Sequence, residues 1–187
     1  MAKTILITGA SSGIGASTAK LFLSRGWNVG LIARREDKLA IIANDHGNSL
    51  CVKCDVCQEN QVKNAFQLMV DHFGAVDVLF NNAGIFTPQA RIDQIDINDW
   101  QKSIDVNLTG MFLAAREAFR HMTKSGGRII NNGSISAHTP REGSAPYTST
   151  KHAITGLTKT IALDGRDLNI CCGQIDIGNA HTEMVAN

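Results

Sequence analysis

Short apolar runs alternate with longer amphipathic stretches along the chain. The runs at residues 3–8, 28–33, 49–54, 76–80, 128–132 and 168–173 have the length and composition of buried β-strands. Helical patterns follow them, to about Arg25, from about Glu36, and at 59–74, 96–124 and 147–163. This alternation predicts an α/β fold with a parallel sheet, and residues 1–187 have a length that suits a single domain. Residues 137–146 contain two prolines and a glycine and read as a loop.

The stretch at 59–74 shows the helical period most clearly. Its apolar residues stand at offsets 0, 3, 4, 7, 8 and 11 from Val62, which places them on one face. We interpret it as a crossover helix that packs on the sheet and carries no chemistry. The longer helix at 96–124, with Asp96 or Asn98 as its cap, contains Asn107 near its middle, where asparagine is a poor helix former.

A glycine-rich turn joins the first strand to the first helix. Gly9 permits a tight turn, Gly13 lets the backbone approach a pyrophosphate, and Gly15 lets helix and strand pack closely. The helix N-terminus supplies N–H groups and a positive dipole for phosphates. The pattern therefore predicts a dinucleotide site made by Gly9, Ser11, Ser12, Gly13, Ile14 and Gly15.

Two arginines follow the second strand, where a carboxylate would hold the ribose 2′-hydroxyl of NAD. A carboxylate would repel a 2′-phosphate, whereas an arginine can bind one bidentately. Glu36 and Asp37 suit the N-terminus of the next helix, but two cations just before it do not suit its dipole. We therefore predict that the cofactor is NADP(H) rather than NAD(H), with Arg34 and Arg35 among its contacts.

Tyr147 is the only tyrosine, and Lys151 stands four residues after it. On a helix these positions share a face, about 5–6 Å apart at Cβ, but the pair alone also fits a plain surface helix. A free tyrosine has a pKa of about 10, so action near pH 7 needs roughly 4 kcal/mol. A lysine charge about 5.5 Å away supplies roughly 3 kcal/mol at an effective dielectric constant of 20. We therefore expect Lys151 to supply most of the lowering of the tyrosine pKa, but not all of it.

Several motifs, in this order, resemble the classical branch of the short-chain dehydrogenase/reductase (SDR) family. They are Thr-Gly-x-x-x-Gly-x-Gly at 8–15, Asn-Asn-Ala-Gly at 81–84, a serine thirteen residues before Tyr147, and Gly178 with Thr182. The resemblance covers residues 3–184 and implies a doubly wound, Rossmann-type parallel sheet of order 3-2-1-4-5-6 with helices on both faces. The substrate lid and last strand of the family are expected to be absent. Ile177 replaces the family's proline, which leaves the backbone there less fixed.

The resemblance also implies roles for single residues. Ser134 would orient the substrate oxygen, Tyr147 would exchange the proton, and Lys151 would assist it and bind the ribose hydroxyls. Asn107 would distort its helix so that a backbone carbonyl holds a water linked to the lysine. Further cofactor contacts would be Asp55, Val56, Asn82, Ala83, Gly84, Tyr147, Lys151, Gly178 and Thr182.

Two stretches around the serine depart from the family or stay generic. Asn131-Asn132-Gly133 is more polar than the family pattern, and the sequence offers no account of that polarity. His138, Arg141 and Glu142 are candidate residues of the substrate rim.

The predicted activity is hydride transfer between NADP(H) and a small carbonyl or secondary alcohol, with Tyr147 as acid or base. The resemblance implies a homodimer or homotetramer. One alternative is a non-catalytic NADP(H)-binding sensor, which would need neither Ser134 nor Tyr147 but would accord with the short C-terminus. Another is an NAD-dependent epimerase-like member of the same superfamily, against which the glycine spacing and Arg34 both count.

Composition excludes other classes of protein. The formal net charge of +1 does not point to nucleic acid or to an anionic membrane. The apolar-rich run at 4–8 is too short for a signal segment or a membrane span, so a cytoplasmic protein is expected. The five cysteines are expected to be free thiols. Cys51, Cys54 and Cys57 have a metal-like spacing but lack a fourth ligand, so we predict no metal site.

Overall fold

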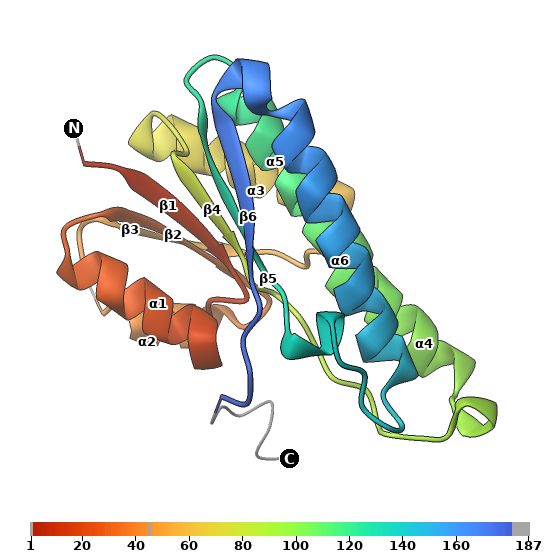
Figure 1. The fold of residues 1–187 in the computed structure, drawn as a ribbon. Helices are drawn as coiled ribbons and strands as arrows, with labels where there is room; N and C mark the ends of the chain where they lie inside the picture. Colours follow the sequence, from red (N-terminus) through yellow and green to blue (C-terminus); the bar gives the residue numbers. More distant parts are fainter. Residues whose placement is uncertain (1, 45, 181–187) are drawn as a thin grey trace.

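A six-stranded parallel sheet forms the centre of the computed structural model, which describes residues 2–44 and 46–180 (Figure 1). Its strand order is β3-β2-β1-β4-β5-β6, which confirms the predicted doubly wound sheet. The strands are β1 (Thr4–Thr8), β2 (Asn28–Ala33), β3 (Ser49–Lys53), β4 (Val78–Asn81), β5 (Gly127–Asn132) and β6 (Ile170–Ile175).

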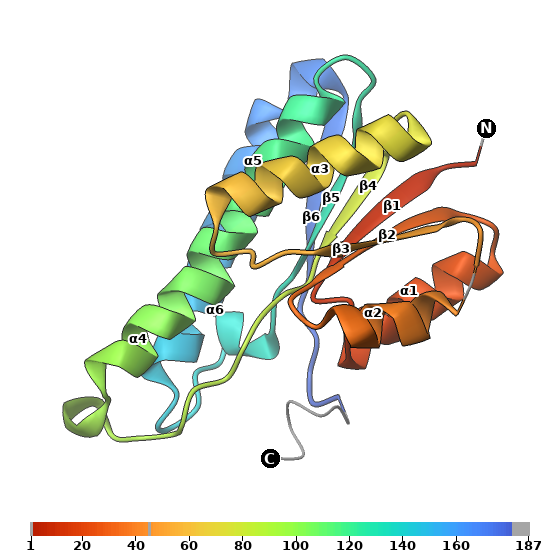
Figure 2. The same cartoon turned by 180° about the vertical axis from the view of Figure 1, so that it is seen from behind.

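Helices cover the sheet in two layers, which are seen from opposite sides in Figures 1 and 2. One layer holds α1 (Gly13–Ser24) and α2 (Glu36–Ala43). The other holds α3 (Glu59–Phe73), α4 (Ile97–Ile104), α5 (Met111–Met122) and α6 (Ala145–Asp164). β1 is buried along its whole length because both faces are covered at the centre of the sheet. Ile5 and Ile7 pack with α1 and α2, whereas Leu6 packs with α3 and α5.

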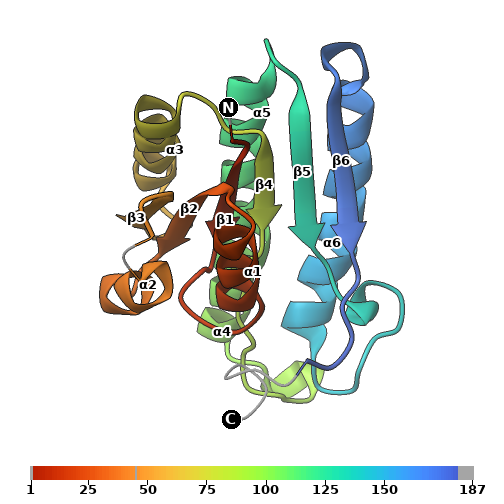
Figure 3. The same cartoon turned by 90° about the vertical axis from the view of Figure 1, so that its left-hand side faces the viewer.

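The edge formed by β5 and β6 is covered on one face only in the described part of the chain. α6 packs on one side of these strands, and Figure 3 shows their other side without a helix. The exposed residues on this open side are Arg128 of β5 and the alternate residues Cys171, Gly173 and Ile175 of β6, of which Ile175 is 48% exposed. The expectation of helices on both faces therefore holds for the centre of the sheet and not for this edge.

The structure corrects several element boundaries. Pro146 was expected in a loop, but it lies in the first turn of α6, where its missing N–H costs no helical hydrogen bond. The strand expected from 76 begins at Val78, and the one expected at 168–173 follows a short 3₁₀ turn and spans Ile170–Ile175. The single helix expected at 96–124 is divided by a π-helical segment, Asp105–Gly110. None of the helices in the described residues combines the length and apolar character of a membrane span.

Gly15→Ala is expected to destabilise the fold. A Cβ at this position would collide with the carbonyl oxygen of Gly9 and lie 2.7 Å from Asn82 Nδ2. Because a backbone atom cannot yield cheaply, we expect a loss of roughly 1–3 kcal/mol in the free energy of unfolding, measured by urea denaturation. Gly156→Ala is the matched control, since a Cβ there meets nothing within 4 Å and should add roughly 0.5–1 kcal/mol. Equal effects of the two substitutions would contradict the packing role of Gly15.

Candidate active site

The carboxyl ends of β1 and β4 are joined through Thr8 and Asn82. Thr8 Oγ1 accepts hydrogen bonds from the N–H groups of Asn82 (2.9 Å) and Ala83 (3.0 Å). Asn82 Nδ2 donates to the carbonyl oxygens of Thr8 (3.0 Å) and Gly9 (3.4 Å). These bonds hold the glycine turn against the loop after β4. The strand order reverses between these strands, which is where open α/β sheets bind their ligands.

The glycine turn has the geometry of a phosphate site. Gly9 and Gly13 have φ angles of +66° and +52°, in the left-handed region that glycine adopts without strain. Ser12 precedes α1 but its side chain does not cap the helix. Its hydroxyl instead accepts a hydrogen bond from Arg35 (2.9 Å), which also donates to the Ser11 hydroxyl (3.0 Å). The first N–H groups of α1 and a neighbouring guanidinium therefore suit a phosphate-bearing ligand.

Arg34 and Asp55 line a pocket of about 350 Å³ beside the ends of β2 and β3. Asp55 Oδ1 accepts from the N–H of Cys57 (3.0 Å), which fixes the carboxylate at the strand end. The pocket is also lined by Gln101 and Lys102 of α4, which lie far away in the sequence and were not predicted. Val56, the other residue of this strand end that was predicted to contact the cofactor, is buried, and its Cγ2 would lie 2.8 Å from a Cβ at Gly110.

Asn107 lies fully buried in the π-helical segment between α4 and α5. Its Oδ1 accepts from the N–H of Ile85 (2.7 Å), and its Nδ2 donates to the carbonyl of Ile85 (2.9 Å) and to Ser103 Oγ (3.2 Å). A Cβ at Gly84 would lie 3.3 Å from Asn107 Oδ1. The side chain therefore fixes the loop after β4, and the helix is distorted at this residue, as π-bulges often are at functional sites. The water-holding role of this segment stays a prediction.

Ser134 lies two residues after the end of β5 and is buried. Its Oγ accepts from the N–H of Ser136 (3.1 Å), and its own N–H donates to Asp176 Oδ1 (3.0 Å). Before it, Asn132 Nδ2 donates to Asn82 Oδ1 (2.9 Å), and Asn131 Nδ2 donates to Thr158 Oγ1 (2.9 Å). The unexplained polarity of this strand end thus consists of amides that tie β5 to its neighbours.

Tyr147 and Lys151 lie in the first turns of α6, close to Ser134. Lys151 is only 5% exposed, and its Nζ donates to the carbonyl oxygen of Asn132 (2.7 Å). The same Nζ lies 5.4 Å from the centre of the Tyr147 ring. The tyrosine ring also contacts Phe86, with 4.2 Å between the ring centres. Phe86 was not predicted, because its position after a turn carries no periodic signal.

Burial shifts the pKa values of Tyr147 and Lys151 in the directions that favour the neutral form of each side chain. It raises the pKa of Tyr147, while the hydrogen bond with Ser134 and the charge of Arg141 lower it and do not reverse the rise. Burial lowers the pKa of Lys151 to about 8, against the opposing effect of the Asp176 carboxylate. The expectation that Lys151 brings the pKa of Tyr147 below its ordinary value is therefore wrong for this structure, because it left out the desolvation of the phenol.

The remaining predicted residues lie at the end of β6 and on the loop before α6. Gly178 is exposed, and a Cβ there would meet nothing within 4 Å, so packing does not require glycine. Thr182 lies outside the described residues. In the loop, Arg141 Nη2 donates to Asn179 Oδ1 (2.7 Å), while Glu142 is exposed. Asp176 was missed, although a carboxylate at the end of a largely apolar strand was a usable signal.

Together, a doubly wound sheet with a phosphate-type turn and a Ser-Tyr-Lys group at its carboxyl edge defines a dinucleotide-dependent class of oxidoreductase. The short chain dehydrogenase family matches residues 3–187, and the chain belongs to this family. A 3beta-hydroxysteroid dehydrogenase of Mediterraneibacter gnavus is 34% identical over 177 residues, which cover 92% of this chain and 64% of that protein. The chain thus spans just under two thirds of the length of this relative.

Solved structures agree with the sequence match. A 3-ketoacyl-(acyl-carrier-protein) reductase from Brucella melitensis, complexed with NADH, has a TM-score of 0.94 and 28% identity, over 98% of this chain and 78% of that one. ElxO with NADP bound has a TM-score of 0.93 and 34% identity, over 100% of this chain and 77% of that one. Each covers the described sheet and its helices.

The buried lysine should make stability depend on pH. The folded pKa of Lys151, about 8, lies below its unfolded value of about 10.4, so the unfolded chain binds more protons between these values. The free energy of unfolding should therefore rise with pH in this range, by about 2 kcal/mol between pH 7 and pH 9.5 relative to Lys151→Met. Urea denaturation of both proteins at the two pH values measures this. A constant difference between them would show that the lysine is not desolvated.

Proposed function

We propose that this chain is an NADP(H)-dependent oxidoreductase that interconverts a carbonyl and a secondary alcohol, with Tyr147 as the acid and base. The observation that carries the proposal is the meeting of Ser134, Tyr147 and the buried Lys151 beside the glycine turn. Lys151 is buried, and its Nζ has the carbonyl oxygen of Asn132 as a partner at 2.7 Å, so its positive charge lowers the stability of the fold. A buried lysine of this kind is more typical of a functional site than of a plain surface helix.

The residues at the end of β1 and β2 fit a dinucleotide that carries an extra phosphate. The uncapped N-terminus of α1 suits the pyrophosphate, which Gly13 would let the backbone approach, while Gly9 and Gly15 let the turn pack against Ala83 and Asn82. Arg34 and Arg35, with Ser11, would hold a 2′-phosphate, and Asp55 would contact the adenine. The similar structures include one with NADH and one with NADP, so they do not decide between the two cofactors. The positive charges of the two arginines favour NADP(H). When bound, the dinucleotide supplies the hydride that reduces a carbonyl.

The chain's own residues would then handle the oxygen and the proton. Ser134 would donate a hydrogen bond to the substrate oxygen, where negative charge develops during reduction. Tyr147 would donate its phenolic proton to that oxygen, and its raised pKa keeps this proton in place at neutral pH. Lys151, whose Nζ lies 5.4 Å from the centre of the Tyr147 ring, would bias the charge on the phenol and would bind the ribose hydroxyls. Asn107 would hold the loop after β4 in position.

Several broader expectations belong to the same proposal. We propose that residues 1–187 act as one dinucleotide-binding and catalytic unit, that the substrate is a small molecule, and that the protein works as a homodimer or homotetramer in the cytoplasm. Binding of nucleic acid or of a resident metal ion is not part of the proposed function.

Tyr147→Phe tests the acid and base. The substitution keeps the ring contact with Phe86 but removes the exchangeable proton, so turnover of ketones with NADPH should fall by about 10²-fold or more. NADPH oxidation gives the rate, and NADPH fluorescence measured in parallel separates lost turnover from lost binding. Ser134→Ala should also reduce kcat strongly, because it removes the donor to the developing charge. Equal rates for wild type and Tyr147→Phe would refute the proposed catalytic role.

Arg34→Ala tests the cofactor. Removing a charge-assisted contact to the 2′-phosphate should weaken NADPH binding by about 10-fold or more and leave NADH within about 3-fold. Calorimetric Kd values for both nucleotides measure this. Arg166→Ala, which removes the same charge from the far end of α6, is the matched control and should change neither Kd. A loss that is equal for both nucleotides would contradict the assignment to the 2′-phosphate.

A further inference from the structure

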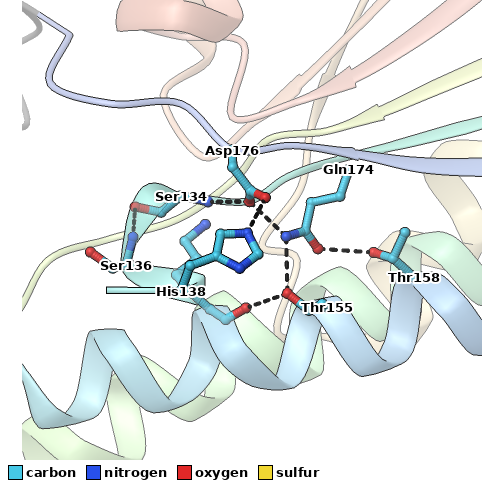
Figure 4. Close-up of polar contacts among 8 residues, drawn as sticks. Ser134, Ser136, His138, Thr155, Thr158, Gln174 and Asp176 are labelled. Atoms are coloured by element: carbon cyan, nitrogen blue, oxygen red, sulfur yellow. Dashed lines mark hydrogen bonds and ion pairs between the residues drawn. The ribbon is translucent and has the colours of Figure 1, made fainter. Parts of the chain in front are cut away.

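The carboxylate of Asp176 lies at the end of β6 and is bonded to Gln174 of the same strand and to two residues after β5, Ser134 and His138 (Figure 4). Oδ1 accepts from the N–H of Ser134 (3.0 Å) and from Gln174 Nε2 (2.6 Å). Oδ2 pairs with His138 Nε2 (2.7 Å). The carboxylate therefore fixes the serine backbone at the end of β5 and the histidine that follows it.

The surroundings of Asp176 are shaped for this contact. A Cβ at Gly133 would collide with Asp176 Oδ1, so glycine at this position lets the carboxylate reach the serine. A chain of hydrogen bonds leads from the centre of the sheet to the same carboxylate. Asn131 donates to Thr158, which donates to Gln174 Oε1 (3.2 Å), and Gln174 Nε2 donates in turn to Thr155 (3.0 Å) and Asp176. Each side chain in this series of hydrogen bonds is an ordinary polar residue, for which the sequence pattern gives no separate signal.

The charged groups around Asp176 come from every element packed on it. His138 pairs with it from the loop after β5, and the charge of Lys151 on α6 interacts with it. Tyr147 on the same helix interacts with Ser134 and with Arg141 on the loop before α6. Burial alone would raise the pKa of Asp176, but the bonds from His138, Gln174 and Ser134 hold it below its ordinary value. The group is therefore a carboxylate at neutral pH, and its charge opposes the loss of the proton from Lys151.

We propose that Asp176 is a positioning residue for the reaction: it fixes the backbone of Ser134 and supplies the negative charge that faces Lys151. This inference rests on the proposed function. The carboxylate touches neither substrate nor cofactor in this scheme, and it acts through the serine and the lysine.

The test compares Asp176→Asn with Asp176→Ala. The asparagine keeps an oxygen for the Ser134 N–H. Its nitrogen can pair with His138 Nε2 once that ring nitrogen acts as the acceptor, so the substitution removes the charge and reverses this one hydrogen bond. The titration midpoint of Lys151 should fall by roughly half a pH unit or more. In the pH profile of kcat, the alkaline limb should shift to lower pH by the same amount. The alanine also loses the acceptors, so kcat should fall about 10-fold or more at every pH. Asp164→Asn, the same charge change at the far end of α6, is the matched control and should leave the midpoint in place.

The midpoint of Lys151 is read by NMR of the labelled lysine side chain, assigned by loss of its signal in Lys151→Arg, and this readout needs no turnover. An unchanged midpoint in Asp176→Asn overturns the inference, even if wild type reduces ketones and the proposed function stands. A shifted midpoint with an unmoved kcat profile also overturns it, because the charge would then not act on the reaction. Absence of turnover in wild type instead overturns the proposed function, so the two failures are distinct. Urea denaturation of each variant confirms that it is folded.

Discussion

Side-chain amides at the ends of parallel strands hold the candidate site together. Asn82 links the glycine turn to the loop after β4, Asn132 links β5 to Asn82, and Asn81 Nδ2 donates to Asn131 Oδ1 (3.1 Å). Strand ends have no further ladder partners, and a buried polar group left unpaired costs about 1–3 kcal/mol. Because these amides satisfy one another, the turn, the loop and the serine cannot shift independently. A site that must align a cofactor, a hydroxyl and a phenol depends on this constraint.

The close packing at these strand ends also buries two ionisable groups, Lys151 and Tyr147. Lys151 reaches a carbonyl oxygen that belongs to the amide network, and it is buried in doing so. Its charge is then costly, and the neighbouring phenol is also desolvated. Pairwise Coulomb energy at a surface-like dielectric predicts a lowered tyrosine pKa, but desolvation reverses the sign. In the proposed reaction, a positive charge that arrives with a bound ligand would lower the pKa of the phenol again.

The glycine turn and the helix faces could be predicted from the residues themselves because these depend on glycine stereochemistry and local periodicity, whereas the sheet order came from the resemblance to the family. The distortion of the helix at Asn107 was expected from the family resemblance alone, since the apolar pattern from 96 to 124 runs through it without interruption, and the structure shows it as a π-helical segment. Pro146 was misplaced because proline was weighed as a loop residue, although the first helical turn tolerates it equally well. The polarity of Asn131 and Asn132 stayed unexplained because the partners of both, Asn81 and Asn82, lie fifty residues earlier in the chain.

The end of β6 shows how one substitution changes what holds a backbone in place. Ile177 stands where the family has proline, so no ring fixes the local φ angle. Here the segment is held instead by the N–H of Ile135 donating to the carbonyl of Ile177 (3.3 Å) and by the bonds to Asp176. A proline ring holds a backbone at any pH, whereas a carboxylate adds a charge next to a buried lysine. With the role proposed for Asp176, the geometry of the serine and the charge of the lysine depend on the same side chain.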